Sequence, residues 1–279
     1  MKALGVHGTE LRYIDRGHGP PVLFVHGFPL DHTMWDSQLD AISQQCRVIA
    51  PDLRGFGRSL LRSAGVPPAS TEAREPPVLP FAMQQFADDL AALLDALGIY
   101  EPVVYCGLSM GGYIAFQFWR KHAARLRGLV LCDTRSTADT PEAAAGRRVM
   151  ADRVLKEGPA FVAETMLPRL FCEATRQQRP ELVEGLRRVV MANSPRGIAA
   201  AALGMAERPD MTASLGDIRC PTLVVVGQDD AISPPAEMRG LAQKIPAAEF
   251  VEIPAAGHMS PLENPAAVTA AIVEFLATL

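Results

Sequence analysis

Apolar positions along the chain fall into short runs separated by segments with helical periodicity. Residues 22–26, 47–51, 103–108, 128–133, 222–227 and 249–253 are apolar at most positions. Such runs are typical of strands in a parallel sheet that is covered on both faces. An amphipathic strand, antiparallel to the others, is expected around residues 11–14. The alternation of these strands with helices predicts an α/β fold.

Two helices of the predicted core are well marked. In the first, apolar residues recur at steps of three and four, which places them on one face; they are Met83, Phe86, Leu90, Leu93, Leu94 and Leu97. The last helix begins at Asn264 and Pro265, a residue pair typical of a helix N-terminus. Its predicted inner face consists of Val268, Ile272, Phe275, Leu276 and Leu279.

One long segment interrupts the alternation. From about residue 135 to residue 215 the sequence contains helical patterns, including a helix start at Ser194–Pro195, and no convincing strand. We therefore predict a core formed by residues 1–134 and 216–279, with residues 135–215 inserted as a helical cap. Residues 63–80 contain five prolines and are interpreted as an exposed loop or linker.

Composition favours a soluble globular chain of 279 residues, 48% apolar and 21% charged, that can bury a full core. A net charge of −4 gives no general attraction to nucleic acid or to anionic membranes, so neither partner is expected. The apolar runs are too short to cross a bilayer, and residues 1–17 do not resemble a signal peptide. The sequence leaves the oligomeric state open, a homodimer included.

The cysteines add information about the compartment. Cys46, Cys106, Cys132, Cys172 and Cys220 form no CxxC pair and no even disulfide framework. Cys106 and Cys132 lie inside strand-like runs, where buried and inert thiols are expected. This usage fits a reducing, cytoplasmic setting.

The most informative motif is Gly-Leu-Ser-Met-Gly at residues 107–111, between a predicted strand and a predicted helix. A serine hydroxyl is a weak nucleophile, so it must be exposed on a sharp turn where a histidine can reach it. Glycines two residues on either side allow the chain to approach closely. This G-x-S-x-G pattern is that of a nucleophile elbow, which makes Ser109 the candidate nucleophile.

The motif and its surroundings resemble the α/β-hydrolase family, and the resemblance extends from Val25 to the final helix. It implies the α/β-hydrolase fold, with a mostly parallel eight-stranded sheet flanked by helices and Ser109 on the elbow. It also implies the chain order serine, acid, histidine for a catalytic triad. Among family branches, the chain resembles serine esterases, lactonases and cofactor-free haloperoxidases (perhydrolases).

His258 is the candidate general base. It follows the strand at residues 249–253, at the same sheet edge as Ser109, and it matches the late Gly-His pair of the family. His7, His18 and His122 lie in polar or terminal contexts and are expected to be solvated. His32 is expected to line the substrate pocket. His26, which precedes Gly27, is interpreted as a buried, hydrogen-bonded residue that shapes its loop without transferring protons.

The acid of the triad is expected after a core strand and before His258. The loop at residues 227–234 resembles the family pattern G-x-x-D-x-[IV]-x-P, which aligns Asp230 with the acid. The neighbouring Asp229 and the earlier Asp133 remain alternatives. The acid would hold the imidazole in the correct tautomer and stabilise the imidazolium.

The family also implies an oxyanion hole formed by two backbone N–H groups. Carried over to this chain, the donors are Phe28, which follows His26–Gly27, and Met110, which follows the serine. Such preset donors stabilise charge that develops only during the reaction. The loop Arg-Gly-Phe-Gly-Arg-Ser at residues 54–59 resembles the family loop after the second parallel strand and is interpreted as structural, with an arginine ion pair.

Ser109, Asp230, His258 and an oxyanion hole predict acyl transfer through an acyl-enzyme. The expected substrate is a small to medium, mainly apolar carboxylic ester or lactone, bound in part by Met166, Leu167 and Phe171 of the cap. The arginine pairs 147–148 and 187–188 are expected on solvated helix faces, with an anionic-substrate role as the alternative.

No metal or nucleotide cofactor is expected, because the sequence contains no HExxH, zinc-spaced Cys/His, GxGxxG or Walker A pattern. Serine at position 109 also argues against the aspartate-based chemistry of dehalogenases and epoxide hydrolases of this fold. Perhydrolysis, suggested by Phe28–Pro29, and carbon–carbon bond hydrolysis remain enzymatic alternatives. A ligand-binding receptor on the same scaffold remains the non-enzymatic one.

Overall fold

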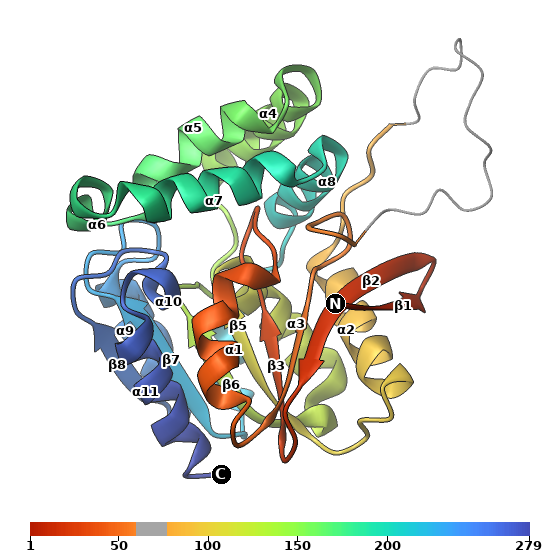
Figure 1. Ribbon diagram of the computed structural model, residues 1–279, viewed down its shortest axis with the longest axis vertical. Coiled ribbons are helices and arrows are strands. Elements are labelled where there is room, and N and C mark those ends of the chain that lie inside the picture. Colours follow the sequence, from red (N-terminus) through yellow and green to blue (C-terminus); the bar gives the residue numbers. More distant parts are fainter. Residues whose placement is uncertain (60–76) are drawn as a thin grey trace.

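The computed structural model describes residues 1–59 and 77–279. These residues form an eight-stranded sheet in the order β1-β2-β4-β3-β5-β6-β7-β8 (Figure 1). β1 pairs with β2 and β2 with β4 in antiparallel fashion, and all the other pairs are parallel. The strand bounds are β1 (Lys2–Val6), β2 (Thr9–Arg16), β3 (Pro21–Val25), β4 (Arg47–Pro51), β5 (Val103–Leu108), β6 (Leu126–Cys132), β7 (Thr222–Gly227) and β8 (Glu249–Ile253).

The predicted α/β-hydrolase architecture is confirmed, and the predicted apolar runs coincide with strands to within two residues. β1 was not predicted. It is an edge strand with one buried residue, so it carries no hydrophobic run. Its hairpin to β2 turns at His7 and Gly8, which both have positive φ angles, as tight two-residue hairpin turns require.

Helices cover both faces of the sheet. α1 packs against α11 on one face, and α2 packs against α3 on the other (Figure 1). The side chain of Asn264 accepts a hydrogen bond from the N–H group of Ala267, so α11 begins where the sequence predicts. The bounds are α1 (Asp36–Ile42), α2 (Met83–Ala96), α3 (Met110–His122), α9 (Pro235–Ala242), α10 (Ser260–Glu263) and α11 (Pro265–Leu276), with 3-10 turns at His32–Trp35, Ala123–Arg125 and Thr212–Asp217.

Five helices follow β6 and precede β7, which confirms the helical character of this segment. They lie together beyond one end of the strands (Figure 1). α4 packs against α8 and α5 against α7. We call this group the helical insertion; it consists of α4 (Pro141–Glu157), α5 (Pro159–Leu170), α6 (Glu173–Gln178), α7 (Pro180–Ala192) and α8 (Pro195–Ala206). The domain boundaries at residues 134/135 and 215/216 stay a prediction.

Two further points complete the description. The proline-rich segment 63–80 lies outside the described residues, except for its last four positions. Within the described parts of the chain, no helix combines the length and the apolar character that a membrane span needs.

Candidate active site

Ser109 occupies a strained turn between β5 and α3. Its φ and ψ angles are 53° and −111°, a conformation that non-glycine residues adopt rarely. A Cβ atom on Gly107 would lie 2.6 Å from the carbonyl carbon of Gly111, and one on Gly111 would lie 2.4 Å from the carbonyl oxygen of Val25. Both glycines are therefore required by close backbone contacts, as the motif predicts.

Hydrogen bonds on both sides hold this turn. The N–H group of Ser109 donates to the carbonyl of Cys132 at 2.9 Å, and the hydroxyl of Thr134 donates to the carbonyl of Ser109 at 2.7 Å. The hydroxyl of the buried Tyr105 donates to the carbonyl of Gly111 at 3.0 Å. The surrounding sheet thus maintains a backbone conformation that would relax in isolation.

His258 and Asp230 form a buried pair. Nδ1 of His258 donates to Oδ2 of Asp230 at 2.8 Å, and the two side chains are 3% and 0% exposed. The other carboxylate oxygen accepts from the N–H groups of Ile232 and Ser233. Burial alone would raise the pKa of Asp230, but His258 and these two N–H groups together lower it. Asp230 therefore stays ionised. Because His258 contacts Asp230 through Nδ1, its Nε2 is free to accept a proton.

The two alternative acids have different surroundings. Asp229 is exposed, and its N–H group donates to the carbonyl of Ala256. Asp133 is fully buried after β6, where it accepts from the N–H group of Gly227 at 2.8 Å and contacts the hydroxyl of Ser260. Burial, and then the neighbouring Asp230, raise the pKa of Asp133 well above its ordinary value. Among the three carboxylates, Asp230 is the one hydrogen-bonded to His258.

A cavity of about 420 Å³ contains both Ser109 and His258 on its lining. Phe28, the first expected oxyanion donor, also lines it. Met110, the second, is the first residue of α3, so its N–H group has no acceptor inside the helix. The structure thus gathers the candidate nucleophile, base and oxyanion donors at one end of α3.

The expected substrate contacts divide into two groups. Met166 lines this cavity, but Leu167 and Phe171, 2% and 3% exposed, belong to the hydrophobic core. In α5, Thr165, Met166 and Arg169 line the cavity, whereas Leu167 packs into the hydrophobic core. The expectation for Leu167 and Phe171 was therefore wrong, and both stabilise the packing of the helical insertion instead.

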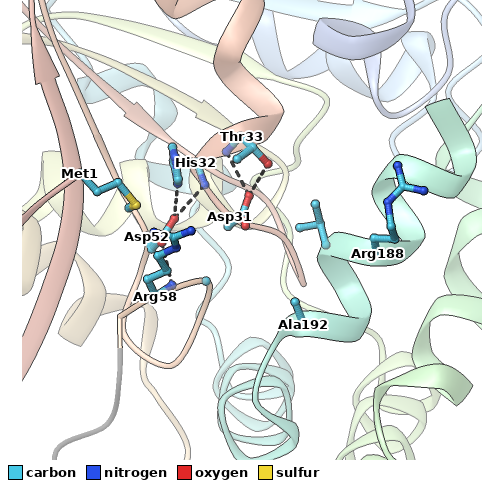
Figure 2. A pocket seen from close by; sticks show the side chains of 11 residues that line it. Met1, Asp31, His32, Thr33, Asp52, Arg58, Arg188 and Ala192 are labelled. Atoms are coloured by element: carbon cyan, nitrogen blue, oxygen red, sulfur yellow. Dashed lines mark hydrogen bonds and ion pairs between the residues drawn. The ribbon is translucent and has the colours of Figure 1, made fainter. Parts of the chain in front are cut away.

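His32 lies in a different cavity, of about 510 Å³, together with Asp52, Arg58 and Arg188 (Figure 2). Its Nδ1 donates to Asp52 at 2.6 Å, and its backbone N–H group donates to the same carboxylate. The other oxygen of Asp52 accepts from the N–H group of Arg58. The expectation that His32 lines the substrate pocket was wrong, because its hydrogen bonds to Asp52 hold it in this other cavity.

Asp31, His32 and Asp52 are also close enough to be tested as a metal site, with ligand atoms within 4.8 Å of one another. The hydrogen bonds above already use Nδ1 of His32 and both oxygens of Asp52. Oδ1 of Asp31 accepts from the N–H and hydroxyl groups of Thr33, as a helix cap does (Figure 2). Asp31, His32 and Asp52 therefore fit a hydrogen-bonded junction between loops better than a metal site.

Two other sequence interpretations are confirmed. His26 is fully buried; its Nδ1 donates to the carbonyl of Gly27 at 2.8 Å and its Nε2 accepts from the N–H group of Leu53 at 3.0 Å. With both ring nitrogens engaged in this way, His26 is a neutral structural residue. Arg54 forms a buried bidentate pair with Asp89, at 2.6 Å for both bonds.

Two polar residues that connect distant segments, Glu263 and Asn193, belong to no sequence motif. Glu263 accepts from the N–H groups of Gly257 and Cys172, which joins the His258 loop to the helical insertion. Asn193, at the end of α7, accepts from the N–H group of Gly57 and donates to the carbonyl of Pro29. Their roles depend on contacts between distant segments, which the sequence pattern does not reveal.

The arginines of the helical insertion differ from expectation in one case. Arg148 is exposed, and Arg187 forms a surface pair with Glu184, as expected for solvated faces. Arg147, in contrast, pairs with Asp139 and lines the Ser109 cavity. Asp139 precedes α4 and was not singled out from the sequence, although it creates this arrangement.

A comparison with protein families agrees with this geometry. The family described as the α/β-hydrolase fold matches residues 20–265, most of the chain. The protein therefore belongs to the α/β-hydrolase fold family.

Individual relatives are enzymes of the expected branches. A thermophilic esterase from Thermogutta terrifontis, solved with malate bound, is 49% identical, with a TM-score of 0.91 and coverage of 100% of this chain and 99% of the other. The enol-lactonase from Burkholderia xenovorans is 30% identical, with a TM-score of 0.86 and coverage of 99% and 100%. A non-heme haloperoxidase of Rhodococcus erythropolis is 38% identical over 118 residues, 42% of this chain and 37% of that protein.

Proposed function

We propose that this protein is a serine hydrolase that cleaves a carboxylic ester or lactone through an acyl-enzyme on Ser109. The observation that carries the proposal is the His258–Asp230 pair, which is buried beside a cavity that Ser109 also lines. Similarity to an esterase and to an enol-lactonase over nearly the whole chain supports the same class of reaction.

In this reaction Oγ of Ser109 attacks the carbonyl carbon of the substrate while Nε2 of His258 takes its proton. The N–H groups of Phe28 and Met110 stabilise the oxyanion. When the tetrahedral intermediate collapses, His258 protonates the departing alkoxide, and the acyl group remains on Ser109. A water molecule then gives a proton to His258 and attacks the acyl carbon. When this second tetrahedral intermediate collapses, His258 returns the proton to Oγ of Ser109, and the carboxylic acid is released. In a lactone, the departing oxygen stays attached to the acyl chain.

The cavity sets the size of the substrate. Its volume of about 420 Å³ lies in the lower part of the usual range for small-molecule sites. The apolar side chains on its lining include Met150, Met166, Met205 and Ile232. We therefore propose a small to medium substrate with an apolar portion, and we propose that the helical insertion acts as the cap over it.

We also propose a cytoplasmic location. All five cysteines are free, and four of them are buried, which fits a compartment where disulfides are not needed for stability.

The function is tested by initial rates on p-nitrophenyl acetate, butyrate and octanoate. Wild-type protein is expected to turn over the shorter esters, and Ser109→Ala to lose this turnover. Ser43→Ala is a matched control, because Ser43 follows α1 next to the amino end of β4 and should leave the rate unchanged. Folded wild-type protein without Ser109-dependent turnover of any of these esters would contradict the proposal, and lactones and carbon–carbon substrates would be tried next.

A further inference from the structure

Three arginines reach the Ser109 cavity from three separate segments. Arg135 comes from the loop after β6, Arg147 from α4 and Arg169 from α5, and all three belong to its lining. The reacting groups Ser109 and His258 belong to the hydrolase core. The cationic groups therefore come from residues 135–169, between β6 and β7, whereas Ser109 follows β5 and His258 follows β8.

These arginines are only partly neutralised. Asp139, the one acidic residue on the lining among the described residues, pairs with Arg147 and also with the buried Arg208 at 2.7 Å. Burial alone would raise the pKa of Asp139, but the two arginines lower it, so one ionised carboxylate is shared by two cations. Arg208 in turn stacks on the ring of Tyr113, 4.1 Å from its centroid.

The other two arginines have weaker partners. Arg135 lies 3.3 Å from Glu237, which is outside the lining, and also donates to the carbonyl of Ile232. Arg169 is exposed and forms no ion pair within the described parts of the chain. The carboxylates of Asp139 and Glu237 supply two negative charges against the four positive charges of the arginines, so a net positive charge remains. The four arginines are Arg135, Arg147, Arg169 and Arg208. Even with the ionised Asp230 behind His258 included, the group stays cationic.

We propose, on the basis of the esterase function above, that the preferred substrates are esters that also carry a free carboxylate. Half-esters of short dicarboxylic acids are the class that fits. Their ester carbonyl would lie at Ser109, their methylene chain against the methionines of the cavity, and their carboxylate at Arg147 and Arg169. Arginine suits this role because its planar guanidinium binds a carboxylate through two hydrogen bonds.

The test compares two esters with the same carbon chain. One is the mono-p-nitrophenyl ester of glutaric acid, with a free carboxylate, and the other is its neutral methyl ester. Wild-type protein is expected to show a kcat/KM about tenfold higher for the anionic ester at low ionic strength, with the advantage shrinking as salt is added. Arg169→Gln and Arg147→Gln should each reduce this ratio roughly three- to fivefold.

Arg148→Gln is the matched control, since Arg148 is exposed on the same helix as Arg147 and does not line the cavity. It should leave the ratio unchanged. Equal turnover of the two esters, or a preference that survives both arginine substitutions, would overturn this inference and leave the esterase function intact. Absence of Ser109-dependent turnover of both esters would instead refute the esterase function, and this inference with it.

Discussion

Three aspartates near the candidate base show how burial and partners decide the role of a single residue. Asp230 is buried and hydrogen-bonded to His258, and Asp229 is exposed one position earlier. Asp133 is buried, with Gly227 and Ser260 as hydrogen-bond partners. The pKa of Asp230 is lowered and that of Asp133 is raised. Burial and partners thus move the pKa of Asp230 and the pKa of Asp133 in opposite directions, whereas Asp229 is exposed.

Asp230→Asn is expected to lower kcat about 10³- to 10⁴-fold, because an amide cannot hold His258 in the tautomer that accepts the serine proton. Steady-state rates on p-nitrophenyl butyrate measure this effect. Asp229→Asn is the matched control and should keep the wild-type rate, since Asp229 is exposed. A comparable loss of kcat in both variants would mean that kcat depends on the structure of the loop and not on the carboxylate at position 230.

Asp133→Asn is expected to change the free energy of unfolding by less than about 1 kcal/mol. The amide oxygen can still accept from the N–H group of Gly227, and the amide NH2 can donate to the hydroxyl of Ser260, which donates to Asp133 in the wild type. Asp133→Ala leaves these buried groups unpaired and should lose about 1–3 kcal/mol or more. Urea denaturation of the two variants at neutral pH gives the comparison. If asparagine proves as damaging as alanine, the site requires a carboxylate, which contradicts the raised pKa of Asp133.

At the residue scale, the sequence predicted groups whose neighbours are close along the chain. The Gly107–Gly111 motif, the Asp230 loop and His258 each lie in a recognisable local pattern. The raised pKa of Asp133 could not be predicted, because it arises only when the sheet buries β6 and β7 side by side. His32 was misplaced for a similar reason, since its partner Asp52 follows a different strand, β4.

At the scale of elements, a few polar side chains connect the helical insertion to the core. Asn193 links the end of α7 to the loops at Gly57 and Pro29, and Glu263 links the His258 loop to Cys172. Pro29 adjoins the expected oxyanion donor Phe28. The positions of the His258 loop and of the loop at Phe28 and Pro29 therefore depend on elements that are distant in sequence.

Asn193→Ala is expected to lower the free energy of unfolding by about 1–3 kcal/mol, because the N–H group of Gly57 and the carbonyl of Pro29 lose their partner. It should also lower kcat/KM, since the Pro29 loop carries Phe28. Urea denaturation and ester hydrolysis are measured on the same preparation. Met191→Ala, at an exposed position of α7, serves as the control. Wild-type stability and activity in Asn193→Ala would show that this link is unimportant.

The His32–Asp52 pair predicts a dependence of stability on pH. Burial alone would lower the pKa of His32, but Asp52 and the nearby Asp31 and Asp36 together raise it. A raised pKa in the folded state stabilises the protein fully below the unfolded value of about 6.5, and this contribution disappears as the pH rises through the folded value.

The free energy that wild type gains over His32→Gln should therefore be larger at about pH 5.5 than at about pH 9. Urea denaturation at the two pH values measures this difference. Met191→Ala, at an exposed position without a titratable group, should show no such trend. A constant or growing advantage of wild type at high pH would contradict the assignment of the ion pair.

Strands and helices of the core were predicted from local patterns because burial on both faces forces the apolar runs of β3, β5 and β7. β1 escaped prediction because only Val6 of this edge strand is buried. Helix starts at Ser194 and Asn264 were recognisable, since each side chain caps its own helix. Contacts between elements, such as those of Asn193, have no comparable local signal.

At the scale of the whole molecule, the cavity lies where the helical insertion meets the carboxyl edge of the sheet. Ser109 and His258 come from the core, whereas Met166, Arg147 and Arg169 come from α5 and α4. The sequence predicted the presence of an insertion but not which of its residues face Ser109. That selection depends on how α4 and α5 pack, which no single helical pattern determines.

The most direct test of the central claim is to detect the acyl-enzyme on Ser109. Protein mixed with p-nitrophenyl butyrate and quenched in acid within the first turnover would be analysed by intact mass and peptide mapping. We predict a mass increase of one butyryl group, located on the peptide that contains Ser109 and absent in Ser109→Ala. Turnover without a covalent species at Ser109, or an acyl group on another residue, would contradict the proposed mechanism.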